Sequence, residues 1–177
     1  MRSFVALVMV MVLVTSAASA APRVALGERS GRCDEDATCV AVELARTLTN
    51  SDDGSLREER FVLDAGLAFE FGRARMYSRG REAVAAIARP WLARPGLEMI
   101  QVEGHTDDVG SEDYNLDLSR RRAERAKAVL LRLGFLANQI EVVGMGSSQP
   151  REHGTSAEAR RKNRRVELVF VTRARPR

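Results

Sequence analysis

The side chains best suited to chemistry gather between Val102 and Arg122. Asp107 and Asp108 fall where an expected strand gives way to a loop, and Arg122 follows near the start of an expected helix. A carboxylate beside an arginine can bind a zwitterion, because the aspartate takes an ammonium group and the arginine takes a carboxylate. The alternative is that Asp107 pairs with Arg122 and simply braces the loop, and the spacing alone leaves both interpretations open.

Three consecutive arginines, Arg120 to Arg122, open the helix expected over Leu118 to Leu133, with Ser119 as its N-cap. A helix N-terminus already carries partial positive charge, so each cation there costs about 0.3–1 kcal/mol. Such an arrangement is instead typical of a site for a carboxylate or phosphate group. The sequence therefore predicts an anion-binding position at this helix start, facing the loop of Asp107.

His105 suggests two other kinds of chemistry. It stands two residues before Asp107, and Ser111 or Ser119 would complete a hydrolytic triad, but no nucleophile-elbow motif accompanies these residues. His105 and His153, taken with the nearby acids, match no metal-ligand spacing. We therefore expect no catalytic residue, no metal site and no cofactor.

Hydrophobic periodicity indicates the elements that must position these residues. Phe61–Leu63 and Leu67–Phe71 flank Asp64-Ala65-Gly66 and predict a β-hairpin. Pro90 is expected to end the first helix, and Gly134 the second. The expected elements, in order, are strands over 61–63 and 67–71, a helix over 78–92, a strand over 97–103, a helix over 118–133, a strand over 140–143, a short helix over 158–162 and a strand over 166–171.

The first twenty residues are typical of a secretory signal peptide. Arg2 provides the positive start, residues 4–14 form an uninterrupted apolar run, and Ala18-Ser19-Ala20 gives an A-x-A cleavage pattern. We expect an exported, mature chain that starts at Ala21 and contains no transmembrane span. The alternative is that the segment stays uncleaved as an N-terminal anchor.

Export changes what is expected of Cys33 and Cys39, the only two cysteines in the sequence. An oxidising compartment favours their pairing as a disulfide, and the alternative is a metal site that includes the acids between them. The expected segments are a signal peptide over 1–20, a leader over 21–58 with the Cys33–Cys39 disulfide, a globular domain over 59–174 and a basic tail over 175–177.

The charge of the 177-residue chain is unevenly distributed. The formal net charge is +4, but residues 21–119 carry 12 basic and 19 acidic side chains, whereas residues 120–177 carry 15 and 5. With 45% hydrophobic and 29% charged residues, the chain is neither an acidic solvating protein nor a multi-span membrane protein. The basic half would permit nucleic-acid binding, but export argues against that partner.

Three runs of sequence resemble the OmpA-like C-terminal domain, a peptidoglycan-binding module of bacterial envelopes. They are VEGHTDDVGSEDYNLDLSRRRAERAKAVL, IEVVGMGSSQP and RRKNRRVELVF, in the order and spacing of that family. The resemblance extends over about Arg60 to Thr172. The combination of the three runs is highly specific, whereas any one of them alone would be a weak signal.

The resemblance implies an α/β fold, more closely an α+β sandwich of βαβαβ type, in which helices pack on a mixed four-stranded sheet. It also implies a ligand: the diaminopimelate residue of the peptidoglycan stem peptide, whose side chain ends in an ammonium and a carboxylate on one carbon. Asp107 would meet this ligand, and Arg122 would meet its carboxylate. The other pocket residues implied by the resemblance are Asn115, Arg164 or Arg165, and the backbone of the loop from Gly104 to Thr106.

We therefore expect a non-enzymatic protein of the periplasm, associated with the outer membrane or the cell wall, that binds peptidoglycan non-covalently and tethers or scaffolds the envelope. One departure from the family is Gly72, which offers only backbone atoms near the ligand. Two alternatives stay open. The first is an adaptor that docks to another envelope protein, and the second is a cell-wall hydrolase that uses His105 with Asp107 or Asp108.

Overall fold

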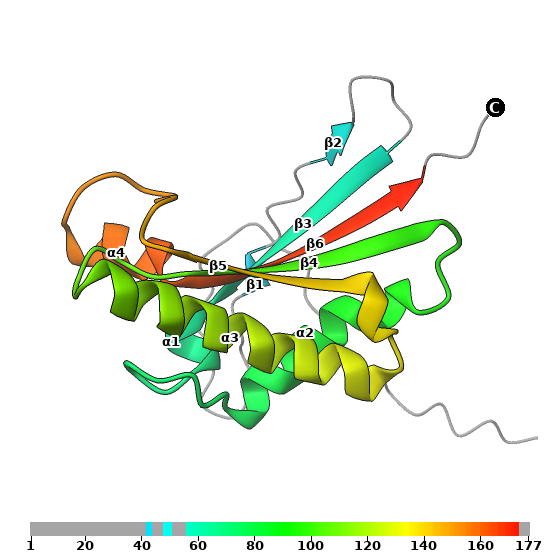
Figure 1. Ribbon diagram of the computed structural model, residues 1–177, viewed down its shortest axis with the longest axis horizontal. Coiled ribbons are helices and arrows are strands. Elements are labelled where there is room, and N and C mark those ends of the chain that lie inside the picture. Colours follow the sequence, from blue (N-terminus) through cyan, green and yellow to red (C-terminus); the bar gives the residue numbers. More distant parts are fainter. Residues whose placement is uncertain (1–41, 44–47, 51–55, 174–177) are drawn as a thin grey trace, which may run out of the picture.

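Four long strands form the centre of the computed structural model, which describes residues 42–43, 48–50 and 56–173 (Figure 1). The expected signal peptide, the Cys33–Cys39 disulfide and the tail over 175–177 lie outside the described residues, so they stay predictions. Within the described part of the chain, no helix combines the length and apolar character that a membrane crossing requires.

The long strands alternate side chains between two faces, and one of these faces is covered by helices. The strands lie in the order β3, β6, β4, β5, while the short β1 and β2 both pair with β3. β4 and β5 are parallel, and β6 is antiparallel to β3 and to β4. The strands are β1 Val42–Glu43, β2 Leu48–Asn50, β3 Leu56–Asp64, β4 Leu97–His105, β5 Ile140–Gly146 and β6 Arg165–Arg173. The predicted mixed four-stranded sheet is confirmed for the long strands.

The helices α2 and α3 lie together against one face of this sheet (Figure 1). As predicted, α2 ends just before Pro90, and α3 ends at Gly134, whose φ of 105° lies in the left-handed region that favours glycine. The helical elements are α1 Ala65–Ala68, α2 Ser78–Ala88, the 3₁₀ turn η1 Arg89–Trp91, α3 Glu112–Leu133, the 3₁₀ turn η2 Ala137–Gln139 and α4 Ala157–Asn163.

The apolar core fills the space between the sheet and these helices. Ile100 and Val102 of β4 and Leu168 of β6 are completely buried there. Trp91 of η1 stacks on Phe170 of β6, with ring centroids 4.2 Å apart. The core therefore joins the central strands to α2, η1 and α3. This packing fixes the position of α3 on the sheet.

The predicted hairpin over residues 61–71 is wrong. β3 runs to Asp64, whose carboxylate accepts the Gly66 N–H and caps the single turn of α1. Phe69, which follows this turn, is buried and forms only an isolated bridge with Met76 instead of continuing a second long strand. The packing is close, because a Cβ on Gly80 of α2 would lie 2.5 Å from a backbone oxygen of α1. The apolar alternation here reflects a buried helical turn.

The predicted start of the arginine-bearing helix is also wrong. α3 begins at Glu112, and its N-cap is Ser111, whose hydroxyl accepts a backbone N–H of the first turn. Glu112 and Asp113 place negative charge in that turn, where the helix dipole favours it. Ser119 is buried inside the helix and accepts the Gly146 N–H at 3.0 Å. The arginines that follow therefore lie in the helix interior, and the anion site predicted at the helix N-terminus is not formed.

Candidate functional site

Two glycines let the ends of the parallel strands approach α3 closely. A Cβ on Gly104 of β4 would lie 2.0 Å from the backbone oxygen of Ser119, and one on Gly144 of β5 would lie 2.8 Å from the Cβ of Arg120. The loop over 106–111, which joins β4 to α3, is thereby held beside the arginine-bearing turn. Gly104, which was expected to contact a ligand, is used in this packing.

Asp107 lies on this loop, and its carboxylate bonds to Arg164 rather than to Arg122. Oδ2 accepts from Arg164 Nη1 at 2.6 Å, and Oδ1 accepts the Val109 N–H at 3.2 Å. Asn115 of α3 donates its side-chain amide to the backbone oxygens of Asp107 and Val109, at 3.3 and 3.1 Å. The predicted supporting residue Asn115 thus braces the loop, and the ion pair that the sequence suggested for Arg122 is made by Arg164.

Arg122 is a buried cation without a carboxylate partner in the described part of the chain. It is 3% exposed, its Nε donates to the backbone oxygen of Arg73 at 3.1 Å, and its guanidinium carbon lies 5.6 Å from the centre of the Phe69 ring. Burial lowers the pKa of Arg122 and the charge of Arg164 lowers it further, whereas Asp107 acts in the opposite direction. A buried charge is costly unless it is paired, so this environment favours an incoming anion.

Thr106 lines a pocket of about 240 Å³ between the β4–α3 loop and residues 147–155. Its backbone N–H donates to Gly146 at 2.8 Å, while its buried Oγ1 has no hydrogen-bond partner among the described residues. Asp108 stands at the same pocket and bonds to Arg160 of α4, which holds the pKa of that carboxyl below its usual value. The pocket is therefore polar and adjoins the Asp107 loop.

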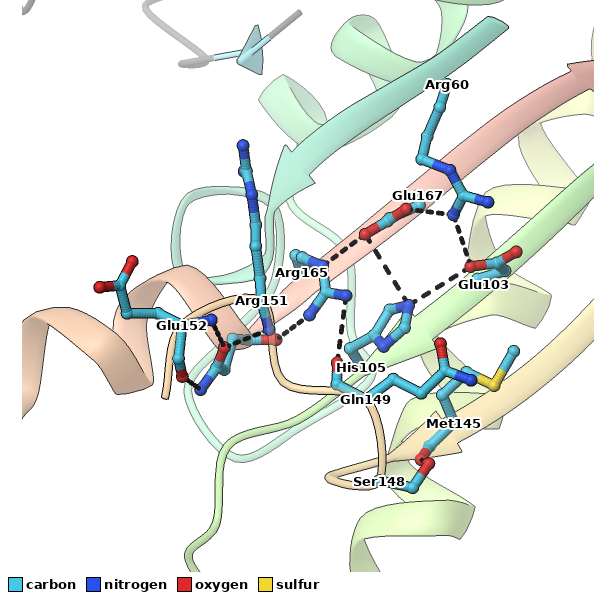
Figure 2. A network of polar contacts seen from close by, with 11 residues as sticks. Arg60, Glu103, His105, Met145, Ser148, Gln149, Arg151, Glu152, Arg165 and Glu167 are labelled. Atoms are coloured by element: carbon cyan, nitrogen blue, oxygen red, sulfur yellow. Dashed lines mark hydrogen bonds and ion pairs between the residues drawn. The ribbon is translucent and has the colours of Figure 1, made fainter. Parts of the chain in front are cut away.

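The two candidate arginines that follow α4 lie in different environments. Arg164 bonds to Asp107, as described above. Arg165, the first residue of β6, is 6% exposed and donates to Glu167 Oε1 at 2.5 Å and to the backbone oxygen of Gln149 at 3.2 Å (Figure 2). The sequence left the choice between them open, and the structure brings only Arg164 to the loop.

Arg165 belongs to a buried ion-pair network on the sheet face opposite the apolar core (Figure 2). Arg60 of β3 donates to Glu103 of β4 at 2.8 Å and also bonds to Glu167 of β6. His105 is 1% exposed, and its Nε2 lies 3.5 Å from Glu103 Oε2. Burial alone would raise the pKa of both glutamates, but hydrogen bonds from the two arginines and the contact of Glu103 with His105 outweigh it, so both pKa values lie below the usual range.

This network was missed in the sequence, where charged residues that alternate with apolar ones in a strand are expected to face solvent. It removes His105 from the loop chemistry, because the imidazole faces Glu103 and Glu167 instead of Asp107. One ligand atom from each of Glu103, His105 and Glu167 lies within 4.8 Å of the others. Two arginines already pair with these carboxylates, so the arrangement is an ion-pair network rather than a metal centre.

The closest sequence signal for the network was the alternation in RRKNRRVELVF, where Arg165 and Glu167 share one strand face. Both the sequence and the structure bring the Asp107 loop together with the turn of α3 that carries Arg122, and with Arg164. Thr106 lies beside this loop in the pocket, and Asn115 supports the loop. Gly104 packs against α3, and Arg165 belongs to the ion-pair network with Glu167.

Comparison with known proteins identifies the family. Residues 68–164 match the OmpA family. Outer membrane protein A of Bordetella avium is 37% identical over 112 residues, or 63% of this chain and 57% of that protein, so the chain spans little more than half of this relative. Outer-membrane lipoprotein YfiB of Pseudomonas aeruginosa is 37% identical over 116 residues, or 64% of this chain and 68% of that protein.

The fold comparison agrees with this match. The crystal structure of the peptidoglycan-associated lipoprotein from Burkholderia pseudomallei aligns with a TM-score of 0.53 and 29% identity, and the alignment covers 58% of this chain and 86% of that one. The family match includes the loop of Asp107, all of α3 and Arg164. On the combined match of sequence and fold, the chain belongs to the OmpA family.

Proposed function

We propose that the chain binds peptidoglycan non-covalently by holding a zwitterionic side chain, that of diaminopimelate, between Asp107 and Arg122. One observation carries the proposal: Arg122 is 3% exposed and lacks a carboxylate partner within the described residues, while a carboxylate at Asp107 is close enough to influence its pKa. The ligand carboxylate binds the Arg122 guanidinium, and the ligand ammonium binds Asp107. Each charge then has a partner of opposite sign.

Arg164 positions Asp107 for this role. It holds Oδ2 at 2.6 Å, whereas Oδ1 accepts only a backbone N–H at 3.2 Å. A carboxylate has about four lone-pair sites, so Asp107 keeps capacity for an ammonium donor. Arg122 supplies the selectivity, since a lysine side chain at the same place of the stem peptide lacks the distal carboxylate.

The proposed cellular role is that of an exported wall tether, in the periplasm beside the outer membrane, that performs no chemical step on the wall. The peptidoglycan-associated lipoprotein among the structural relatives supports the ligand, and the names of the two sequence relatives support the outer-membrane location. The burial of His105 in an ion-pair network supports a binding role over hydrolysis.

The experiment that tests the proposal is co-sedimentation of the exported chain with insoluble peptidoglycan sacculi at moderate salt. Asp107→Ala and Arg122→Ala are the test variants. Glu141→Ala, an exposed acid on β5 outside both pockets, and Arg132→Ala, an exposed arginine on α3, are the matched controls. We expect wild type and controls to pellet and both test variants to stay soluble.

Free diaminopimelate should release the wild-type protein from sacculi, whereas free lysine should not. If all the variants pellet alike, the basic half of the chain adheres to an anionic polymer and the proposal is wrong. If wild type stays soluble, the family fold serves another partner, and the proposal is equally wrong.

A further inference from the structure

A second, strongly basic groove adjoins the proposed ligand site. It holds about 520 Å³ and runs between the turn over 72–75 and the outer face of α3. Arg73 and Arg75 line it from the turn, and Arg121 and Arg125 line it from the helix. The sequence motif accounts for Arg122 but not for this additional positive charge.

Glu124 of α3 also lines the groove, so one acid faces four arginines there, and the acids that pair with these arginines do not neutralise them. Glu70 lies 3.9 Å from Arg73 and 3.3 Å from Arg75, and those two arginine side chains are 74% and 79% exposed. Arg121 pairs with Asp117 at 2.7 Å, but its side chain is 57% exposed. Arg125 is exposed and forms no hydrogen bond or ion pair with any residue that the structure describes. Guanidinium groups in such positions can turn toward an anion placed in the groove.

The groove and the proposed site share one wall. Arg122 Nε donates to the backbone oxygen of Arg73, and the Tyr114 hydroxyl donates to the backbone oxygen of Gly72 at 3.1 Å. Arg122 and Arg125 are neighbours on α3, separated by roughly 4.5 Å along the helix axis at about 1.5 Å per residue. The zwitterion is the tip of the diaminopimelate side chain, so the adjoining residue of the stem peptide is joined through that side chain and lies farther from Arg122 than one backbone step. A groove that begins at the wall of the site and extends outward along α3 is placed for that adjoining residue.

We propose that this groove binds a carboxylate of the same stem peptide, carried by the glutamyl residue next to diaminopimelate. The inference rests on the proposed function, because that function brings the stem peptide to Arg122. Planar guanidinium groups bind carboxylates in pairs of parallel hydrogen bonds, which favours a carboxylate over an uncharged sugar in this groove. The chain would then bind charged groups of two neighbouring residues of the stem peptide, diaminopimelate and glutamate, rather than of one.

The test compares three ligands by titration calorimetry: free diaminopimelate, a soluble muropeptide with a free glutamyl carboxylate, and the same muropeptide with that carboxylate amidated. Arg75→Gln and Arg125→Gln change the two walls of the groove. Arg132→Gln is the matched control, since it removes one exposed arginine from α3 outside the groove.

We expect each groove variant to weaken binding of the free-acid muropeptide by roughly three- to fivefold, the range for one exposed charge pair. Binding of free diaminopimelate and of the amidated muropeptide should be the same in groove variants, control and wild type. The wild type should also bind the free-acid muropeptide more tightly than the amidated one.

Three results would overturn the proposal: equal wild-type affinity for the two muropeptides, an equal loss in Arg132→Gln, or displacement of the free-acid muropeptide by inorganic phosphate at millimolar concentration. The last result would make the groove a phosphate site. Failure of the proposed function looks different, since free diaminopimelate would then not bind the wild type at all.

Discussion

Arg122 combines almost complete burial with the lack of a carboxylate partner among the described residues. In the unliganded protein this arrangement costs free energy, because a single backbone oxygen and an aromatic face replace the water that the guanidinium loses. On the proposed function, a ligand carboxylate would offset this cost. Arg122 would then serve binding at the expense of stability.

This argument predicts that Arg122→Met separates stability from binding. Methionine fills a similar volume without a charge, so the midpoint of thermal unfolding should stay the same or rise. Affinity for free diaminopimelate should fall at least about 30-fold, because Asp107 and the ligand carboxylate lose their cationic partner. Arg132→Met, on the exposed face of α3, should change neither quantity. A marked drop in unfolding temperature for Arg122→Met would show instead that the arginine stabilises the fold.

Glu167 shows the opposite behaviour, since it is a buried charge with two cationic partners, Arg60 and Arg165. We predict that Glu167→Gln lowers the free energy of unfolding by about 3–5 kcal/mol, because both arginines then lack that compensating charge. Urea unfolding at neutral pH measures the effect. Glu98→Gln on β4, which removes a surface pair with Arg173 of β6, should leave the urea midpoint nearly unchanged. Equal effects for the two variants would contradict the network.

The contact between β4 and α3 decides where the Asp107 loop lies. We predict that Gly104→Ala costs about 3 kcal/mol or more, because its Cβ would lie 2.0 Å from the backbone oxygen of Ser119 and must force strand and helix apart. Gly134→Ala at the end of α3 is the comparison, since nothing lies within 4 Å of its Cβ and only its φ of 105° opposes alanine. That change should cost about 1 kcal/mol.

Binding gives a second readout for the same pair of variants. Gly104→Ala should weaken diaminopimelate binding, because it shifts the loop relative to Arg122, whereas Gly134→Ala should leave the affinity unchanged. Similar losses of stability in the two variants would mean that strand and helix yield to the added Cβ, so that the close approach does not explain the glycine at position 104.

Periodicity predicted β4, β6 and most of α2 and α3 correctly, because these elements bury one regular apolar stripe or face. It failed at the start of α3, where Ser119 before three arginines resembles an N-cap. The hydroxyl of Ser119 has a tertiary partner instead, the Gly146 N–H, and no local pattern indicates that contact. The hairpin failed because Asp64 caps a helical turn, where the sequence indicates a turn between two strands.

At the site, residue type predicted Asp107 and Arg122, because a carboxylate and a guanidinium on adjoining elements match a zwitterion. The pairing of Asp107 with Arg164 could not be predicted from spacing, since the two residues are 57 positions apart. Their contact depends on β6 lying beside β4 in the sheet. Local patterns thus suggested the two groups proposed to face the ligand, while the contacts that hold Asp107 came from topology.

The topology of the whole molecule also brings the basic C-terminal half of the sequence into contact with the acidic half. β6 comes from the basic C-terminal half and lies between β3 and β4, which come from the acidic half. This interleaving pairs Arg164 with Asp107 and Arg161 with Asp64 across long sequence distances. The basic groove beside α3 is left outside the interleaved region, which concentrates the remaining positive charge near the proposed ligand.

The same interleaving predicts how stability depends on pH. The pKa values of Glu103 and Glu167 lie below their ordinary value of 4.5 in the folded protein, since bonds from Arg60 and Arg165 and the contact with His105 outweigh the effect of burial. The folded state therefore binds fewer protons than the unfolded state on acidification. The stabilisation is complete above the ordinary carboxyl pKa and is lost as the pH falls through the lower, folded values.

We expect the free energy of unfolding in urea to decline between roughly pH 5 and pH 3. Glu167→Gln removes one of the two groups responsible, so its decline over this range should be shallower, although its stability at pH 7 is already lower. Glu98→Gln should follow the wild-type slope, because that carboxylate is 42% exposed and belongs to a surface pair. If Glu167→Gln and wild type decline in parallel, the acid sensitivity arises from other carboxylates, and the buried network does not control it.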